Sequence, residues 1–214
     1  MSKLLETAKE NLSFLLTCIL IALALVAVAR IAEHFLPPKR KVSPTRRITL
    51  IAICSAIATV LHLLDFPLPF LAPGFYKLDF SELPVLLCSF YLGPSAGVVC
   101  EGMKILLKLL TKGTSTAFVG DFANFVVGCT LVLPAAICYH VKKTKKTALL
   151  GLALGTVIMT IFGSLFNAVY LLPKFSVLFG LPLDQIVAMG SSINGQIHSV
   201  STLVLFSVAP LNLL

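Results

Sequence analysis

Long apolar runs, separated by short loops rich in proline, glycine or basic residues, constrain this chain more than any other feature. Leu12–Ala32 alone supplies about 20 residues, enough for a helix to cross the hydrocarbon core of a bilayer. Of the 214 residues, 57% are hydrophobic and only 12% are charged, about half the charged share of a soluble domain. The sequence therefore predicts an all-α, polytopic membrane helix bundle. Further spans are expected at Ile48–Leu64, Ser81–Leu92, Ser95–Leu110, Phe118–Tyr139 and Ala148–Leu172, and a long apolar segment runs from Ile186 to Leu214.

The first apolar run is predicted to be a retained helix and not a cleaved signal peptide. It is longer than the apolar core of a signal peptide, and the acids Glu6 and Glu10 precede it. A basic, proline-containing linker follows, which breaks helical structure. Residues 1–45 are therefore expected to form an extra N-terminal membrane helix and linker, and residues 46–214 the main membrane domain.

The lysines and arginines predict the orientation of the chain. Nine of the 17 lie in residues 39–47 and 142–146, and the four expected spans between these clusters make an even number of crossings. Both clusters are therefore expected on one side, the cytoplasm by the positive-inside rule. The net charge of +8 is expected to orient the protein and to face anionic lipid, not nucleic acid.

A group of polar residues is predicted near the opposite, outer face of the membrane. Charges such as those of Lys77 and Asp79 at a membrane edge mark either a ligand-facing position or an interfacial anchor, and the sequence leaves both open. Polar residues that converge at one depth are typical of a small-molecule pocket. Asn124 and Asn167 also lie inside apolar helices and need partners. The full group is Lys77, Asp79, Asp121, Asn124, Asn167 and Lys174.

Glu101, Lys104 and Lys108 form a second polar set, with spacings that place them on one face of a helix. Charges on one face of a membrane helix point into the bundle or into a wet cavity. The alternative is an internal ion pair between Glu101 and Lys104 that only fixes packing, and both interpretations stay open at this point.

Several classes of function lack their motifs in this sequence. The six cysteines lie within apolar runs without a Cys-x-x-Cys pair, and the four histidines are scattered, so we expect no metal site and no cofactor. There is no Gly-x-x-x-x-Gly-Lys-Ser/Thr loop for a nucleotide and no nucleophile elbow. If the protein concentrates a solute, the energy must come from a partner or from an ion gradient.

Several motifs, in the same order along the chain, resemble the riboflavin-specific S component of energy-coupling factor (ECF) transporters. They begin with Lys77-Leu78-Asp79-Phe80-Ser81-Glu82-Leu83-Pro84, Gly93-Pro94-Ser95-Ala96-Gly97 and Glu101-x-x-Lys104. They continue with Gly120-x-x-Ala123-Asn124-Phe125-x-x-Gly128, Leu133-Pro134, Asn167-x-x-Tyr170-x-x-Pro173 and Pro210-Leu211-Asn212-Leu213-Leu214. The resemblance covers residues 46–214.

This resemblance implies a compact bundle of six membrane helices in a bacterial cell membrane. Members of the family bind the vitamin outside and deliver it through an ATP-driven module of one membrane subunit and two ATPases. Riboflavin would then be the transported ligand, and the protein would not be an enzyme. The substrate-binding residues implied for this chain are Leu78, Asp79, Asn124, Asn167 and Asn212, with Lys104 and Lys174 as further candidates.

The resemblance also implies a docking surface and two departures from the family pattern. Ala52-x-x-x-Ala56 resembles the small-residue motif for docking on the membrane subunit, although the same pattern also serves packing inside a bundle. The extra N-terminal helix is not part of the six-helix plan. Family members continue beyond the Pro-x-Asn-x-x motif, so we expect the last helix to be incomplete or replaced at Leu214. Whether Ile186–Ala209 crosses the membrane is left open.

Two other interpretations are kept beside the transporter hypothesis. One is a membrane enzyme acting on lipid or isoprenoid, for which Asp65, Asp79 and Asp121 are the nearest trio of acids. The other is a truncated remnant that does not transport.

Overall fold

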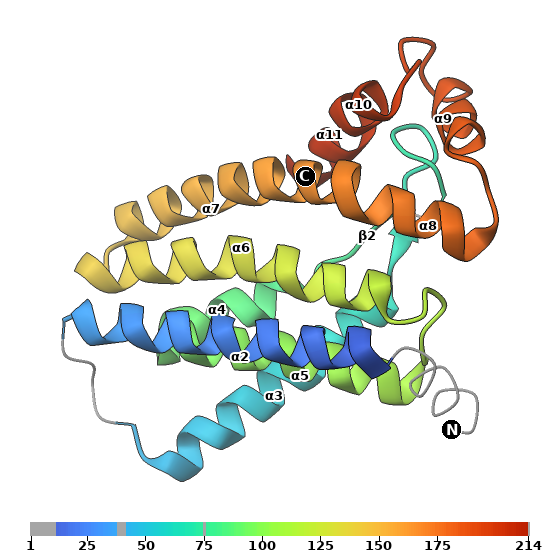
Figure 1. Cartoon of the computed structure of the whole chain (residues 1–214). Coiled ribbons are helices and arrows are strands. Elements are labelled where there is room, and N and C mark those ends of the chain that lie inside the picture. The colour runs from blue at the N-terminus through green and yellow to red at the C-terminus, as the bar shows by residue number, and fades with distance from the viewer. Residues whose placement is uncertain (1–11, 38–41, 75, 214) are drawn as a thin grey trace. The chain divides into compact units, whose positions relative to one another are not determined.

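The computed structural model describes residues 12–37, 42–74 and 76–213, and these are mainly helical (Figure 1). Four of the described helices are long and apolar enough to cross a membrane: Leu16–Phe35, Pro44–Leu63, Val119–Lys142 and Lys145–Leu178. The fold is thus the predicted helical membrane bundle. The chain divides into two compact units, each described by itself: unit 1 (Met1–Leu63 and Phe80–Gly155) and unit 2 (Leu64–Asp79 and Thr156–Leu214).

Unit 1 is built around a central helix, α5, which contacts four other helices of the unit. A Cβ atom at Gly97 of α5 would lie 2.6 Å from Ser89 Cβ and 2.7 Å from Val132 Cγ1, so glycine is what permits this close approach. The turn into α5 is Gly93-Pro94, as predicted, with Gly93 at a φ of 114° and Pro94 in the first turn. The helices of unit 1 are α2 (Leu12–Phe35), α3 (Pro44–Leu63), α4 (Glu82–Leu92), α5 (Pro94–Thr111), α6 (Val119–Lys142) and the first part of α7 (Lys145–Phe166).

The described residues of the two basic clusters lie at the same end of unit 1. Arg47 at the start of α3 donates a hydrogen bond to the Ser95 hydroxyl at the start of α5, at 2.9 Å. At the other cluster, His140 near the end of α6 lies 3.0 Å from the carbonyl oxygen of Ser89 in α4. The start of α3 and the end of α6 therefore lie on the same side, in agreement with an even number of crossings between them.

Unit 2 combines a two-stranded ladder with a set of short helices. The strands β1 (Phe66–Pro67) and β2 (Lys77–Leu78) pair antiparallel, and Lys77 forms an ion pair of 3.0 Å with Asp65. A core that includes Leu172, Ile186 and Leu203 holds the helices together. These are the remainder of α7, η1 (Asn167–Leu171), α8 (Leu172–Phe179), α9 (Leu183–Ser191), α10 (Val200–Leu203), η2 (Val204–Val208) and α11 (Ala209–Leu213).

The two π-helical segments of unit 2, η1 and η2, have a shared cause in the sequence. Each ends two residues before a proline, Pro173 or Pro210. A proline cannot donate a backbone hydrogen bond, and its ring clashes with the carbonyl four residues earlier. The helix responds with wider bonds, from Leu172 N–H to the Asn167 carbonyl and from Ala209 N–H to the Val204 carbonyl.

One predicted helix differs from the structure, and the structure describes one segment that the sequence left open. The sixth apolar helix, expected over Ala148–Leu172, runs on through η1 into α8, because Pro173 widens the helix without ending it. Ile186–Ala209 is not one helix: α9 ends at Ser191, and a new helix starts only at Val200. The hydroxyl of Ser199 accepts a hydrogen bond from Thr202 N–H and caps this new start.

Candidate functional site

A buried charged triad, formed by Glu82, Glu101 and Lys104, lies in the interior of unit 1. The ammonium nitrogen of Lys104 lies 2.6 Å from Glu101 Oε1 and 2.8 Å from Glu82 Oε1, and it donates to Ser81 Oγ at 3.1 Å. Lys104 and Glu101 are fully buried, and Glu82 is partly exposed. The predicted ion pair between Glu101 and Lys104 is thus confirmed, with Glu82 from α4 as an additional member.

The packing of α6 against α5 depends on this triad. A Cβ atom at Gly128 would lie 2.7 Å from Glu101 Oε1 and 2.9 Å from Glu82 Oε1, so the carboxylates occupy the space that a side chain would need. The three N–H donors of Lys104 face three oxygen atoms, which gives this residue a packing role. A contact between Lys104 and substrate stays a prediction.

Asn124 lies one turn before Gly128 on the same face of α6. Its side-chain oxygen is buried and has no hydrogen-bond partner among the described residues. A buried amide oxygen without a partner costs about 1–3 kcal/mol. A bound ligand with an N–H group at this position would remove that cost.

Asn167 is held in a fixed orientation within unit 2. It is the first residue of η1, and its side-chain nitrogen donates to the Gly163 carbonyl at 2.8 Å. The hydroxyl of Tyr76 donates to the Asn167 side-chain oxygen at 2.9 Å. Burial raises the pKa of the Tyr76 phenol, so it is a neutral donor at physiological pH. Each polar atom of the amide keeps capacity for one more hydrogen bond.

Tyr76 is the residue of this region that sequence reasoning missed. The sequence alone does not indicate that Tyr76 contacts a residue 91 positions away. Its hydrogen bond brings the segment of Leu78 and Asp79 together with Asn167. The position of Tyr76 directly before the Lys77-x-Asp79 motif was the available signal.

The remaining predicted substrate-binding residues divide between the two units. Asn212, in α11 of unit 2, has a buried side-chain nitrogen without a hydrogen-bond partner among the described residues. Lys174, in α8, has an exposed side chain. Unit 2 holds Leu78, Asp79, Asn167, Lys174 and Asn212, and unit 1 holds Lys104 and Asn124. Their role as substrate contacts stays a prediction.

The predicted docking residues Ala52 and Ala56 are exposed on α3. The opposite face of this helix is buried, and it carries Ser55, Ala58 and Thr59. The exposed alanines therefore present a smooth strip of backbone and small side chains that a second helix can approach closely.

Two of the three acids considered for an enzyme are engaged in other interactions. Asp65 pairs with Lys77, and Asp121 accepts from both Lys108 and the Thr114 hydroxyl. Among the described residues, no group of three or more histidine, cysteine or acidic side chains is arranged to hold a metal ion.

Comparison with known proteins yields a consistent set of similarities. The family described as "ECF transporter, substrate-specific component" matches residues 46–214. The riboflavin transporter RibU of Staphylococcus aureus is 39% identical over 143 residues, which cover 67% of this chain and 74% of that protein. The riboflavin transporter FmnP of Bacillus subtilis is 36% identical over 132 residues, covering 61% and 69%.

A solved structure adds similarity of fold. It is the S component of a bacterial ECF transporter, with a TM-score of 0.61 and 34% sequence identity. The match covers 80% of this chain and 86% of the solved chain. Sequence and fold thus point to the same family.

Proposed function

Because the chain belongs to the family of substrate-specific components of ECF transporters, we propose that it is the riboflavin-binding subunit of an uptake transporter in a bacterial cell membrane. In this role it binds riboflavin at the outer face and delivers it inward with an ATP-driven coupling module. It is a transport component and not an enzyme.

The observation that carries the proposal is the state of the three predicted amides. Asn124 has an unpartnered buried oxygen, Asn212 an unpartnered buried nitrogen, and Asn167 an amide fixed by Tyr76 and Gly163. The flat ring of riboflavin carries one N–H donor between two carbonyl acceptors along one edge, and its opposite, dimethylbenzene end is apolar. Amide side chains supply both donors and acceptors, so they suit this edge.

The proposal is tested by titrating purified protein with riboflavin and following the quenching of flavin fluorescence. Asn124→Ala and Asn167→Ala each remove hydrogen bonds from a buried site, and we expect binding to weaken by about 1–3 kcal/mol, or about 5–150-fold in Kd. Asn194→Ala is the matched control, because the side-chain oxygen of Asn194 accepts only a local hydrogen bond, from Gln196 N–H, among the contacts described.

The control separates a ligand contact from a general effect of losing an amide. Unchanged affinity in both Asn124→Ala and Asn167→Ala would contradict the assignment of these residues as riboflavin contacts. A loss of riboflavin affinity seen only in Asn194→Ala would instead place the riboflavin contact in the loop between α9 and α10. Addition of flavin mononucleotide as a competitor, in the same assay, distinguishes riboflavin from its nucleotide as the preferred ligand.

The coupling module is proposed to dock on the exposed strip of Ala52 and Ala56. The chain carries no nucleotide-binding loop, so hydrolysis of ATP must occur on a partner. Small residues permit the close backbone approach by which membrane helices associate. The basic clusters near the start of α3 and the end of α6 would then lie in the cytoplasm, on the side where ATP is available.

A further inference from the structure

Two serine hydroxyl groups in unit 2 are buried and have no hydrogen-bond partner among the described residues. They belong to Ser164 in α7 and to Ser207 in η2. A helical serine usually donates its hydroxyl to a carbonyl of the preceding turn, as Ser55 does to Ile51 at 2.7 Å and Ser89 does to Leu86 at 2.8 Å. Because a buried hydroxyl without a partner is costly, these two indicate a partner that the described chain does not supply.

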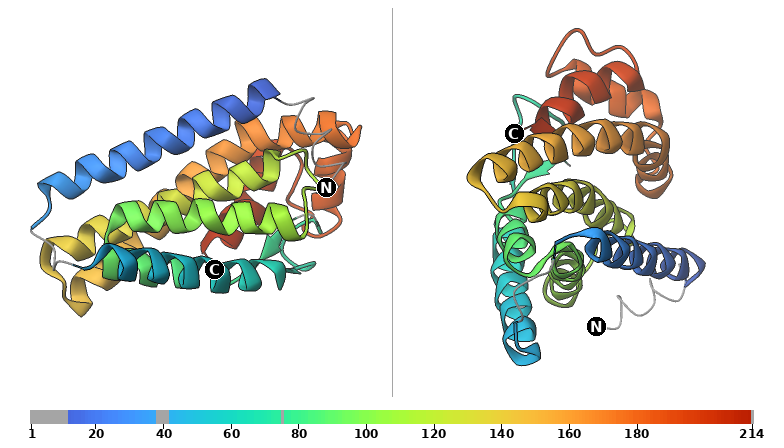
Figure 2. Two further views of the ribbon diagram at one scale, coloured as in Figure 1. Left: turned by 90° about the horizontal axis from the view of Figure 1, so that it is seen from below. Right: turned by 90° about the vertical axis from the view of Figure 1, so that its left-hand side faces the viewer.

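The two serines lie on helices that pack against each other. The segment η1 contacts η2, and Ala168 of η1 packs against the same core as Val204 and Val208 of η2. The orange segment from η1 to α8 lies beside the red segment from η2 to α11 and runs in the opposite direction (Figure 1 and Figure 2). Ser164 lies one turn before Ala168, and Ser207 directly precedes Val208. Helical spacing therefore places both serines along the seam between these segments.

Each of the two serines also lies close to an amide that is proposed to bind riboflavin. Ser164 precedes Asn167 by three residues, and Ser207 precedes Asn212 by five, so about one helical turn separates the members of each pair. The side-chain nitrogen of Asn212 is likewise buried without a partner among the described residues. The seam thus combines amides with hydroxyl groups, and each of these groups can both donate and accept hydrogen bonds.

The absence of buried charge along this seam restricts the ligand that it can bind. In the described part of unit 2, the buried polar residues are Asn167 and Ser207, and neither is charged. A phosphate or a carboxylate would lack an opposite charge there, whereas the hydroxyl of a ligand can both donate to a serine and accept from it. Riboflavin carries a chain of several hydroxyl groups attached to its ring.

We propose that Ser164 and Ser207 bind the hydroxylated chain of riboflavin, and that they make the protein prefer riboflavin over a flavin ring without this chain. The inference rests on the proposed function, and it adds residues that determine specificity to the amides assigned to the ring.

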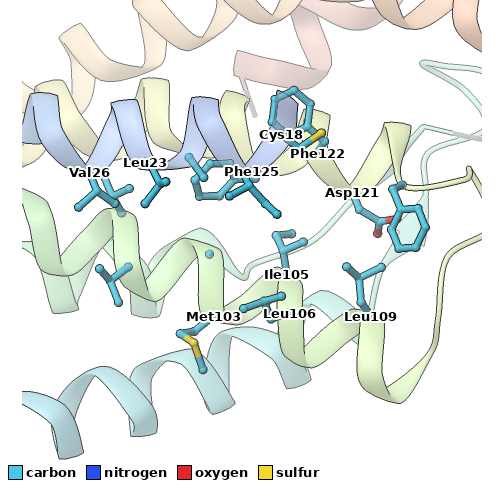
Figure 3. Close-up of a pocket in the computed structure, with 16 residues that line it drawn as sticks. Cys18, Leu23, Val26, Met103, Ile105, Leu106, Leu109, Asp121, Phe122 and Phe125 are labelled. Carbon is cyan, nitrogen blue, oxygen red and sulfur yellow. The ribbon is translucent and has the colours of Figure 1, made fainter. Parts of the chain in front are cut away.

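The apolar pocket of unit 1 does not offer the same chemistry. It has a volume of about 370 Å³ and lies between α2, α5 and α6, with Met103 and Phe125 in its walls (Figure 3). Among the described residues that line it, none has a hydroxyl or an amide side chain, and both carboxylate oxygens of Asp121 are engaged, by Lys108 and by the Thr114 hydroxyl. A hydroxylated chain placed there would lose its hydrogen bonds to water without replacement.

Lumiflavin makes a direct test possible, because it has the same ring with a methyl group in place of the hydroxylated chain. Purified protein is titrated with riboflavin and with lumiflavin, and the quenching of flavin fluorescence gives each Kd. One hydrogen bond changes a binding constant by about 2–10-fold. We expect Ser164→Ala and Ser207→Ala each to weaken riboflavin binding by such a factor and to leave the Kd of lumiflavin unchanged.

Two controls separate a ligand contact from a structural role. Ser55→Ala removes a buried helical hydroxyl that has protein partners, and it should leave the ratio of the two Kd values unchanged. The melting temperature without ligand should not fall in Ser164→Ala or in Ser207→Ala, because neither hydroxyl bonds to a described residue of the protein.

The outcomes distinguish this inference from the proposed function. If the unmodified protein binds neither flavin, the proposed function fails, and this inference fails with it. If riboflavin binds but the ratio of the two Kd values is the same in the unmodified protein and in both serine variants, only the role of the serines is refuted. An equal loss of affinity for riboflavin and lumiflavin would also overturn the proposal, because the serines would then act on the ring or on the fold.

Discussion

Replacing Lys104 with methionine should destabilise unit 1 more than any other single loss of charge in it. Methionine fills nearly the same volume but removes the ammonium group that lies between the buried carboxylate of Glu101, at 2.6 Å, and the partly exposed carboxylate of Glu82, at 2.8 Å. Removal of one partner from a buried ion pair costs about 3–5 kcal/mol, because an uncompensated charge remains. Glu101, which is fully buried, would be left facing Glu82 with no positive charge between them.

The expected loss translates into a measurable change in melting temperature. For a chain of this size each kcal/mol shifts Tm by about 2–4 °C, so Lys104→Met should lower Tm by about 6–20 °C. The protein carries its own reporters, because Cys88, Cys100 and Cys129 are almost completely buried. A thiol-reactive fluorophore added to the protein in mild detergent will label them only as the bundle unfolds.

Two variants separate the charge from other effects of the substitution. Lys112→Met makes the same change at an exposed position and should leave Tm nearly unchanged. Glu101→Gln leaves one ammonium facing one carboxylate, so it should cost less than Lys104→Met. A Tm of Lys104→Met no lower than that of Lys112→Met would refute the reasoning, and so would a larger loss in Glu101→Gln.

Three further predictions follow from the geometry. Gly128→Ala should lower stability by about 1–3 kcal/mol, measured by the same thiol assay, because its Cβ would overlap the two carboxylates; an unchanged Tm would contradict this. Ala52→Trp should abolish co-purification with the coupling module while riboflavin binding persists, whereas Leu150→Trp should not; co-purification of both would leave Ala52 without a docking role. With the native cysteines removed, a membrane-impermeant reagent should label Lys77→Cys in intact cells and spare Lys145→Cys, and the reverse pattern would invert the topology.

The long membrane helices could be predicted from the sequence because a helix that crosses a bilayer needs about 20 consecutive apolar residues, which hydropathy detects. The expected Ile48–Leu64 corresponds to α3 (Pro44–Leu63), and the expected Ser95–Leu110 corresponds to α5 (Pro94–Thr111). Proline and glycine marked the turn at Gly93 for a local steric reason. These features depend only on residues that are close together along the chain, so one sequence is enough to predict them.

Features that depend on how helices pack could not be predicted in the same way. Spacing along α5 placed Glu101 beside Lys104, but it could not reveal Glu82, which approaches from α4. The bond from Tyr76 to Asn167 joins a loop to a distant helix. Hydropathy left Ile186–Ala209 open, because the loop after Ser191 is short and the residues on both sides of it are apolar.

The attachment of α2 illustrates why packing, and not hydropathy, decides such questions in a membrane. Lipid tails are as apolar as leucine, so two helices associate there only through close contact and polar bonds. For α2, the described contacts of this kind are the buried Ala29 and the hydrogen bond of Glu33 to Ser95, both toward one end. Between Val26 and Cys18, the same stripe of α2 is only half-buried and lines an apolar pocket that α5 and α6 complete. Among the described contacts, a buried small residue and a polar bond therefore hold α2 most firmly toward its Glu33 end.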